Sequence, residues 1–81
     1  MFKARTTDGR NNISGTRLKE LRKALQISQR ELSDRLQVVG LDIDKNAVQR
    51  IESGERFVTD IEIIALSKCF NVTVNNLLGI K

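Results

Sequence analysis

The feature that most constrains this chain is a local pattern that marks the start of a helix and recurs along the sequence. An apolar residue precedes a hydroxyl or carboxylate residue, and a second apolar residue comes four positions after it. The polar side chain can accept a hydrogen bond from a free backbone N–H of the first turn, while the apolar pair packs across that turn. Complete copies, which add a glutamate three positions after the cap, span Ile27–Leu32 and Val58–Ile63, and copies without it span Ile43–Val48 and Val72–Leu77.

The residues between these starts continue at helical spacing, and the sequence contains no proline. A first helix is expected after Ile13 and Ser14, because one apolar stripe follows there, made of Leu18, Leu21 and Leu25. Gly54 stands where a left-handed residue would end the third helix, and Gly40 interrupts the pattern after the second. We therefore predict a compact all-α domain with five helices, over residues 15–25, 29–39, 45–53, 60–70 and 74–79.

Length and composition place the chain among small soluble domains. Its 81 residues allow one core, and 40% hydrophobic with 30% charged residues is an ordinary globular composition. The folded domain is expected over residues 13–81. Residues 1–12 contain little apolar material, and Arg5 and Arg10 make them a basic N-terminal arm.

Several functional classes are poorly supported. Apolar stretches are far shorter than the roughly 20 residues of a membrane span, and the first residues lack a signal-peptide core, so we expect a cytoplasmic protein. Cys69 is the single cysteine, and there is no histidine to act as base or metal ligand beside it. Cys69 is therefore interpreted as a small core residue. We expect no cofactor, no metal and no enzymatic activity.

The charge balance favours an acidic partner. The formal net charge is +4 and the sequence pI is about 9.7. A basic surface gains affinity for a polyanion by releasing its counterions. This charge alone does not specify nucleic acid, because many small basic proteins bind no polyanion.

Two runs carry a resemblance to a known family. The segments Gln29–Leu36 and Lys45–Gly54 resemble the Cro and lambda-repressor-like helix-turn-helix family, also called the Xre family, and the likeness extends from Ile13 onward. It implies a lambda-repressor-like domain whose second and third helices form the helix-turn-helix. It also implies a sequence-specific regulator of transcription that binds double-stranded DNA, acts as a repressor and works as a homodimer. In that setting the basic arm is either a solvated terminus or a segment that reaches a DNA groove or backbone.

The resemblance implies which residues contact DNA. The helix over residues 45–53 would lie in the major groove, and the helix that begins at Gln29 would cross the phosphate backbone. Asn46 and Gln49 carry amide groups suited to adenine. Lys45 and Arg50 suit guanine or phosphate. The expected DNA-binding residues, including a phosphate contact in the loop that follows, are Gln29, Lys45, Asn46, Gln49, Arg50 and Arg56.

Other positions have a structural interpretation. In the family, an arginine at the place of Arg22 pairs with a glutamate at the place of Glu52 and ties the first helix to the third. We expect that ion pair here. The face of the third helix opposite the polar residues is apolar, and its members should lie in the core: Ala47, Val48 and Ile51.

The sequence departs from the family in one connection. The segment Gln37–Ile43, between the second and third helices, is longer than the usual tight turn of about three or four residues. We expect the second helix to continue for about one turn before Gly40 and Asp42 bend the chain. The residues expected to cover the core there are Val38, Leu41 and Ile43.

A second class of function competes with DNA binding. The fold also suits a protein-interaction module, such as an antitoxin or an anti-repressor partner. That class predicts apolar or aromatic anchors on the third helix. The residues found there, at positions 45, 46, 49 and 50, are polar or basic, which favours DNA while leaving a protein partner open.

Overall fold

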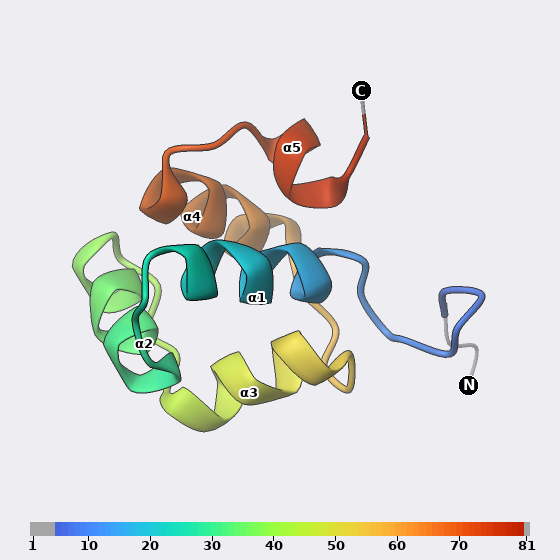
Figure 1. Cartoon of the computed structure of the whole chain (residues 1–81), viewed down its shortest axis with the longest axis horizontal. Helices are drawn as coiled ribbons and strands as arrows, with labels where there is room; N and C mark the ends of the chain where they lie inside the picture. Colours follow the sequence, from blue (N-terminus) through green and yellow to red (C-terminus); the bar gives the residue numbers. More distant parts are fainter. Residues whose placement is uncertain (1–4, 81) are drawn as a thin grey trace.

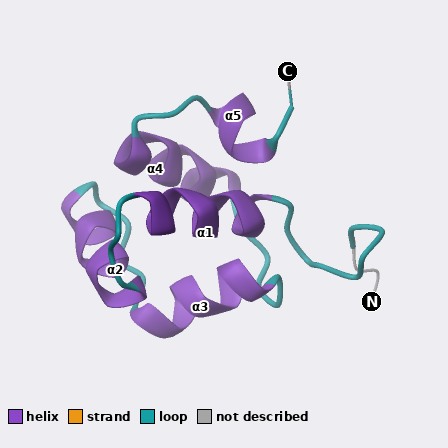
Figure 2. Ribbon diagram, in the orientation of Figure 1, coloured by secondary structure: helices purple, strands orange, loops and turns teal. Residues whose placement is uncertain are grey.

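Five helices make up the computed structural model, which describes residues 5–80 (Figure 1). They are α1 (Ser14–Ala24), α2 (Gln29–Val38), α3 (Lys45–Ser53), α4 (Asp60–Phe70) and α5 (Val74–Leu78). No strand occurs in this part of the chain (Figure 2). The predicted all-α class is confirmed, and the bounds of α3 and α4 agree with those predicted. None of the helices within residues 5–80 is long and apolar enough to cross a membrane.

The helix starts follow the pattern found in the sequence. Ser28 Oγ accepts from the backbone N–H of Glu31 at 3.0 Å, and the Glu31 carboxylate accepts in return, so α2 has a complete capping box. Thr59 starts α4 in the same way. Asp44 and Thr73 cap α3 and α5 with their side chains alone. The caps therefore set where these four helices begin.

The start of α1 differs from the prediction. Ile13 is its N-cap residue and makes no side-chain cap bond. The side chain that caps the helix comes one residue earlier, where Asn12 Oδ1 accepts from the backbone N–H of Gly15 at 2.9 Å. Ser14 is already part of the helix and is buried. Asn12, assigned above to the arm, thus belongs to the folded domain.

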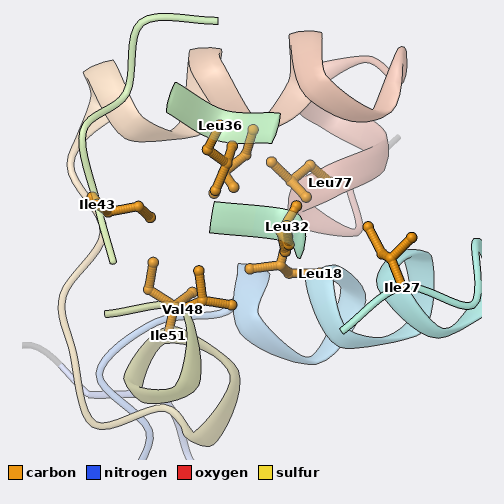
Figure 3. Close-up of a cluster of buried hydrophobic side chains, with 9 residues drawn as sticks. Leu18, Ile27, Leu32, Leu36, Ile43, Val48, Ile51 and Leu77 are labelled. Atoms are coloured by element: carbon orange, nitrogen blue, oxygen red, sulfur yellow. The ribbon is translucent and has the colours of Figure 1, made fainter. Parts of the chain in front are cut away.

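The core lies between the five helices, with α1 packed against α3, α4 and α5, and α2 packed against α3 and α4. In Figure 1, α1 runs through the middle, with α3 on one side and α4 and α5 on the other. Leu18 of α1, Leu32 of α2 and Leu77 of α5 converge at its centre (Figure 3). The buried apolar cluster consists of Leu18, Ile27, Leu32, Leu36, Ile43, Val48, Ile51, Leu66 and Leu77.

The long connection between α2 and α3 is ordered by a tight reversal. Gly40 adopts a left-handed conformation, φ 95°, and the Leu41 N–H donates to the Leu36 carbonyl at 2.9 Å. Leu41 packs against the core and Ile43 is buried, as predicted. The prediction for Val38 is wrong, because its side chain is 87% exposed. Val38 lies two positions beyond buried Leu36, on the opposite side of the helix.

Gly15 lies where the backbones of α1 and α3 come close together. A Cβ built on Gly15 would overlap the backbone carbonyl oxygen of Ile51. That oxygen belongs to the helix itself, so a side-chain rotation cannot relieve the overlap. The spacing of the two helices therefore requires glycine at this position.

We expect Gly15→Ala to lower the free energy of unfolding by about 2 kcal/mol, a typical cost of overpacking. The sign is opposite to helix propensity, by which alanine in place of glycine would stabilise a helix by about 1 kcal/mol. Urea unfolding followed by circular dichroism measures the change. Thr16→Ala, at the exposed next position of α1, is the control and should cost nothing. Equal stability of the Gly15→Ala variant and wild type would contradict the close approach.

Candidate nucleic-acid interface

The third helix presents a polar face to solvent and an apolar face to the core. Val48 and Ile51 are fully buried and Ala47 packs against them, as predicted. On the other side, the exposed residues include Lys45, Asn46, Gln49 and Arg50. Within residues 5–80, the side chains of these four residues form no hydrogen bond or ion pair. Arg22 and Arg56, in contrast, are each paired with a glutamate. Amide and basic groups that have no internal partner are available to a ligand.

Glu52, on the same helix, points the other way and joins three helices. Its side chain is 3% exposed, and Arg22 of α1 donates to both carboxylate oxygens, from Nε at 2.6 Å and from Nη2 at 3.1 Å. Gln29 Nε2 of α2 donates to the same carboxylate at 3.1 Å. Arg22 also donates to the Ile27 carbonyl at 2.9 Å. The structure thus forms the ion pair that the resemblance implied, and adds Gln29 to it.

Arg56, in the loop after α3, has an internal partner. Its guanidinium donates to both oxygens of Glu62, at 3.0 and 2.7 Å, and its side chain is 32% exposed. Burial tends to raise the pKa of Glu62, but hydrogen bonds from Arg56 and from Thr59 outweigh it and hold the pKa below its ordinary value. Glu62 therefore stays ionised at neutral pH. The main contact of Arg56 is this ion pair, and the guanidinium remains partly exposed to solvent.

Residues of the basic arm contact α3, which the sequence analysis missed. Arg10 and Asn12 donate hydrogen bonds to backbone carbonyls in the last turn of α3, and Asn11 donates to the loop behind it. The polarity and charge of the side chains could not predict these contacts, because the acceptors are backbone carbonyls. Residues 1–4 of the arm lie outside the described residues.

Two consecutive helices, the second packed on the core by its apolar face and presenting polar groups outward, form the arrangement expected of a helix-turn-helix protein. The profile of the helix-turn-helix family matches residues 18–77. The chain belongs to this family, and its fold is of the lambda-repressor-like, Xre-like type that the sequence runs indicated. The comparison with curated proteins finds no match.

Two solved structures are similar to this chain. The first is the restriction-modification controller protein C.AhdI from Aeromonas hydrophila, with 30% identity and a TM-score of 0.67 over 79% of this chain and 86% of that one. The second is the P22 c2 repressor protein in complex with a synthetic operator, with 25% identity and a TM-score of 0.69 over 83% of this chain and 94% of that one.

We expect Arg22→Met to lower the free energy of unfolding by about 3 to 5 kcal/mol, because it leaves the buried Glu52 carboxylate without its charged partner. The double variant Arg22→Met, Glu52→Met removes both charges and should regain much of that loss. The control is Arg17→Met, which breaks the exposed pair with Glu20 and exposed hydrogen bonds to Asn76 and should cost at most about 1 kcal/mol. Urea unfolding measures all three, and equal losses in both single variants would refute a special role for the buried pair.

Proposed function

We propose that this protein is a transcriptional regulator that binds double-stranded DNA and reads the major groove with α3. The observation that carries the proposal is the polar face of α3, whose amide and basic side chains are exposed and have no partner among residues 5–80. An α-helix fits the major groove, where each base pair presents a distinct set of donors and acceptors. The fold supports the proposal, since the similar P22 c2 repressor was solved with an operator.

The side chains divide by chemistry between bases and phosphates. Asn46 and Gln49 can pair with adenine through two hydrogen bonds each, while Lys45 and Arg50 address guanine or the backbone. Asn46 and Gln49 are three positions apart and share one face, so both can reach neighbouring base pairs. The net charge of +4 adds affinity that does not depend on sequence.

Gln29 and Arg56 act at the edges of this surface. Gln29 stands at the first position of α2, where free backbone N–H groups can also bind a phosphate oxygen. Its amide is half-buried and bonded to Glu52, so it orients α3 as well. Arg56 meets phosphate with the exposed part of its guanidinium while it remains paired with Glu62. The protein acts as a repressor by occupying its site.

A homodimer increases the affinity and specificity of so small a domain, and α4 offers a surface for it. Ile61 is 73% exposed and Ile64 is 50% exposed, and Phe57 just before the helix is 47% exposed. A second copy would remove these side chains from water. The Cα atoms span 34 × 28 × 22 Å, a size compatible with two copies bound to half-sites about one DNA turn, roughly 34 Å, apart.

The charges on the same helix fit a second copy of this chain. Asp60 and Lys68 are exposed and lie four positions before and after Ile64, on one stripe of α4. When two copies of α4 pair antiparallel about a twofold axis at Ile64, Asp60 of each copy meets Lys68 of the other. A twofold interface must be complementary to itself in this way. The partner assigned to the exposed isoleucines is therefore another copy of the chain.

Selection from a randomised duplex library at near-physiological salt tests the DNA-binding proposal. We expect wild type to enrich a palindrome-like sequence, and the double variant Asn46→Ala, Gln49→Ala to lose that enrichment while unfolding at the same urea concentration. Each lost bidentate contact should cost about 1 to 3 kcal/mol of base discrimination. Absence of enrichment by wild type would overturn the proposal and favour the protein-interaction class.

Sedimentation equilibrium tests the α4 interface. We expect Ile64→Asp to convert the dimer to a monomer, because it buries two carboxylates at the twofold axis. Val38→Asp makes the same change at an exposed position of α2 and should leave the dimer intact. Asp60→Lys should weaken dimerisation by about tenfold through like-charge contacts. Adding Lys68→Asp should restore it, and failure of that rescue would refute the antiparallel arrangement.

A further inference from the structure

Asn12 joins three parts of the fold through one side chain. It is 8% exposed, and its Oδ1 accepts from Gly15 at the start of α1. Its Nδ2 donates to the Ile51 carbonyl in α3 at 3.0 Å and to the Arg56 carbonyl in the following loop at 2.7 Å. One amide thereby uses its acceptor and both donors on segments that are far apart in sequence.

The two residues before it continue the contact along the end of α3. Arg10 Nη2 donates to the Glu52 carbonyl at 2.8 Å. The Asn11 backbone N–H donates to the Gly54 carbonyl at 2.7 Å, and its side chain donates to the Glu55 carbonyl at 2.8 Å. We call Arg10, Asn11 and Asn12 the N-terminal clamp. The clamp thus engages five carbonyls in the last turn of α3 and the loop after it, those of Ile51, Glu52, Gly54, Glu55 and Arg56.

Two of these acceptors, the Ile51 and Glu52 carbonyls, lie in the last turn of α3, where carbonyls lack the partner that the next turn would supply. The positive charge of Arg10 also lies at the negative end of the α3 dipole. Gly54 allows this approach, because a Cβ there would meet the Arg10 side chain at 2.8 Å. The clamp is itself braced by a turn, in which the Arg10 N–H donates to Thr6 Oγ1 at 2.9 Å and the Thr6 N–H donates to the Arg10 carbonyl at 2.8 Å.

The opposite end of α3 packs against α2. It follows the connection from Val39 to Asp44, in which Asp42 and Asp44 are exposed and Ile43 provides the buried anchor. The Glu52 carboxylate, in the last turn of the same helix, ties α3 to α1 and α2. The clamp and the Glu52 side chain therefore hold the C-terminal end of α3 together, and the clamp alone extends this hold to the loop beyond the helix.

We propose that Arg10, Asn11 and Asn12 are positioning residues for DNA recognition: they hold α3 at the angle at which its polar face reads bases. This inference rests on the proposed function and deepens it. Base discrimination requires hydrogen-bond geometry at several side chains together, whereas nonspecific affinity depends on charge. Loss of the clamp therefore reduces the preference for the specific site more than it reduces binding to any duplex.

The experiment compares binding of the full chain to two duplexes, the one enriched by wild type and a scrambled one of equal length. Asn12→Ala removes no charge, and we expect its affinity for the enriched duplex to fall about tenfold, the worth of roughly one bidentate base contact. Its affinity for the scrambled duplex should stay within about twofold. Urea unfolding curves identify the conditions in which each variant is folded. This control is needed because unfolding would lower the affinities for the enriched and the scrambled duplex equally.

Variants of Arg10 provide a second test, which can be carried out even if Asn12→Ala does not fold. Arg10→Ala should reduce the ratio of the two affinities, and Arg10→Lys, which keeps a charged donor for the Glu52 carbonyl, should recover it. Arg17→Ala removes the same charge from the exposed face of α1 and should leave the ratio unchanged. An unchanged ratio in the folded clamp variants overturns the positioning role, whereas a wild type that enriches no duplex overturns the proposed function itself.

Discussion

The carboxylate of Glu52 is the interaction on which the rest of this structure depends. It belongs to α3, yet its hydrogen bonds come from Arg22 on α1 and Gln29 on α2. A buried charge that lost either donor would destabilise all three helices together. Val48 and Ile51 are buried with Glu52 on the inner face of α3, whereas Gln49 and Arg50 are exposed. The same helix therefore carries the bond that holds the fold and the side chains proposed to read DNA.

Local chemistry made most helix bounds predictable, and tertiary contacts account for what was missed. The starts of α2 and α4 follow from a serine or threonine with a glutamate three positions on, which is a pattern within one turn. The start of α1 depends on Asn12, whose side chain also bonds to α3. Val38 was placed in the core by its apolar character, although Leu41 returns there after the reversal at Gly40. The apolar and polar pattern of the sequence reveals neither the bond from Asn12 to α3 nor the return of Leu41 to the core.

The candidate site was predictable to the same extent. Helical periodicity alone puts positions 46, 49 and 50 on one face, and the structure shows them exposed. The partner of Arg56 was not predictable, because Glu62 already had a role in the capping box of α4. A carboxylate has two oxygens, and Glu62 serves Thr59 and Arg56 at once. The N-terminal clamp was missed because its acceptors are backbone carbonyls, which every residue possesses.

Because the N-terminal clamp binds backbone carbonyls, the residues that hold α3 in place are separate from the side chains proposed to read DNA. Since the clamp grips only main-chain oxygens of α3 and its loop, it places no demand on which side chains α3 presents to solvent. Positions 45, 46, 49 and 50 can then change identity without loss of the scaffold, provided that Glu52 and the apolar residues remain. The architecture is thus suited to retargeting: a new binding preference, natural or engineered, requires substitutions on one exposed face and no compensating change beneath it.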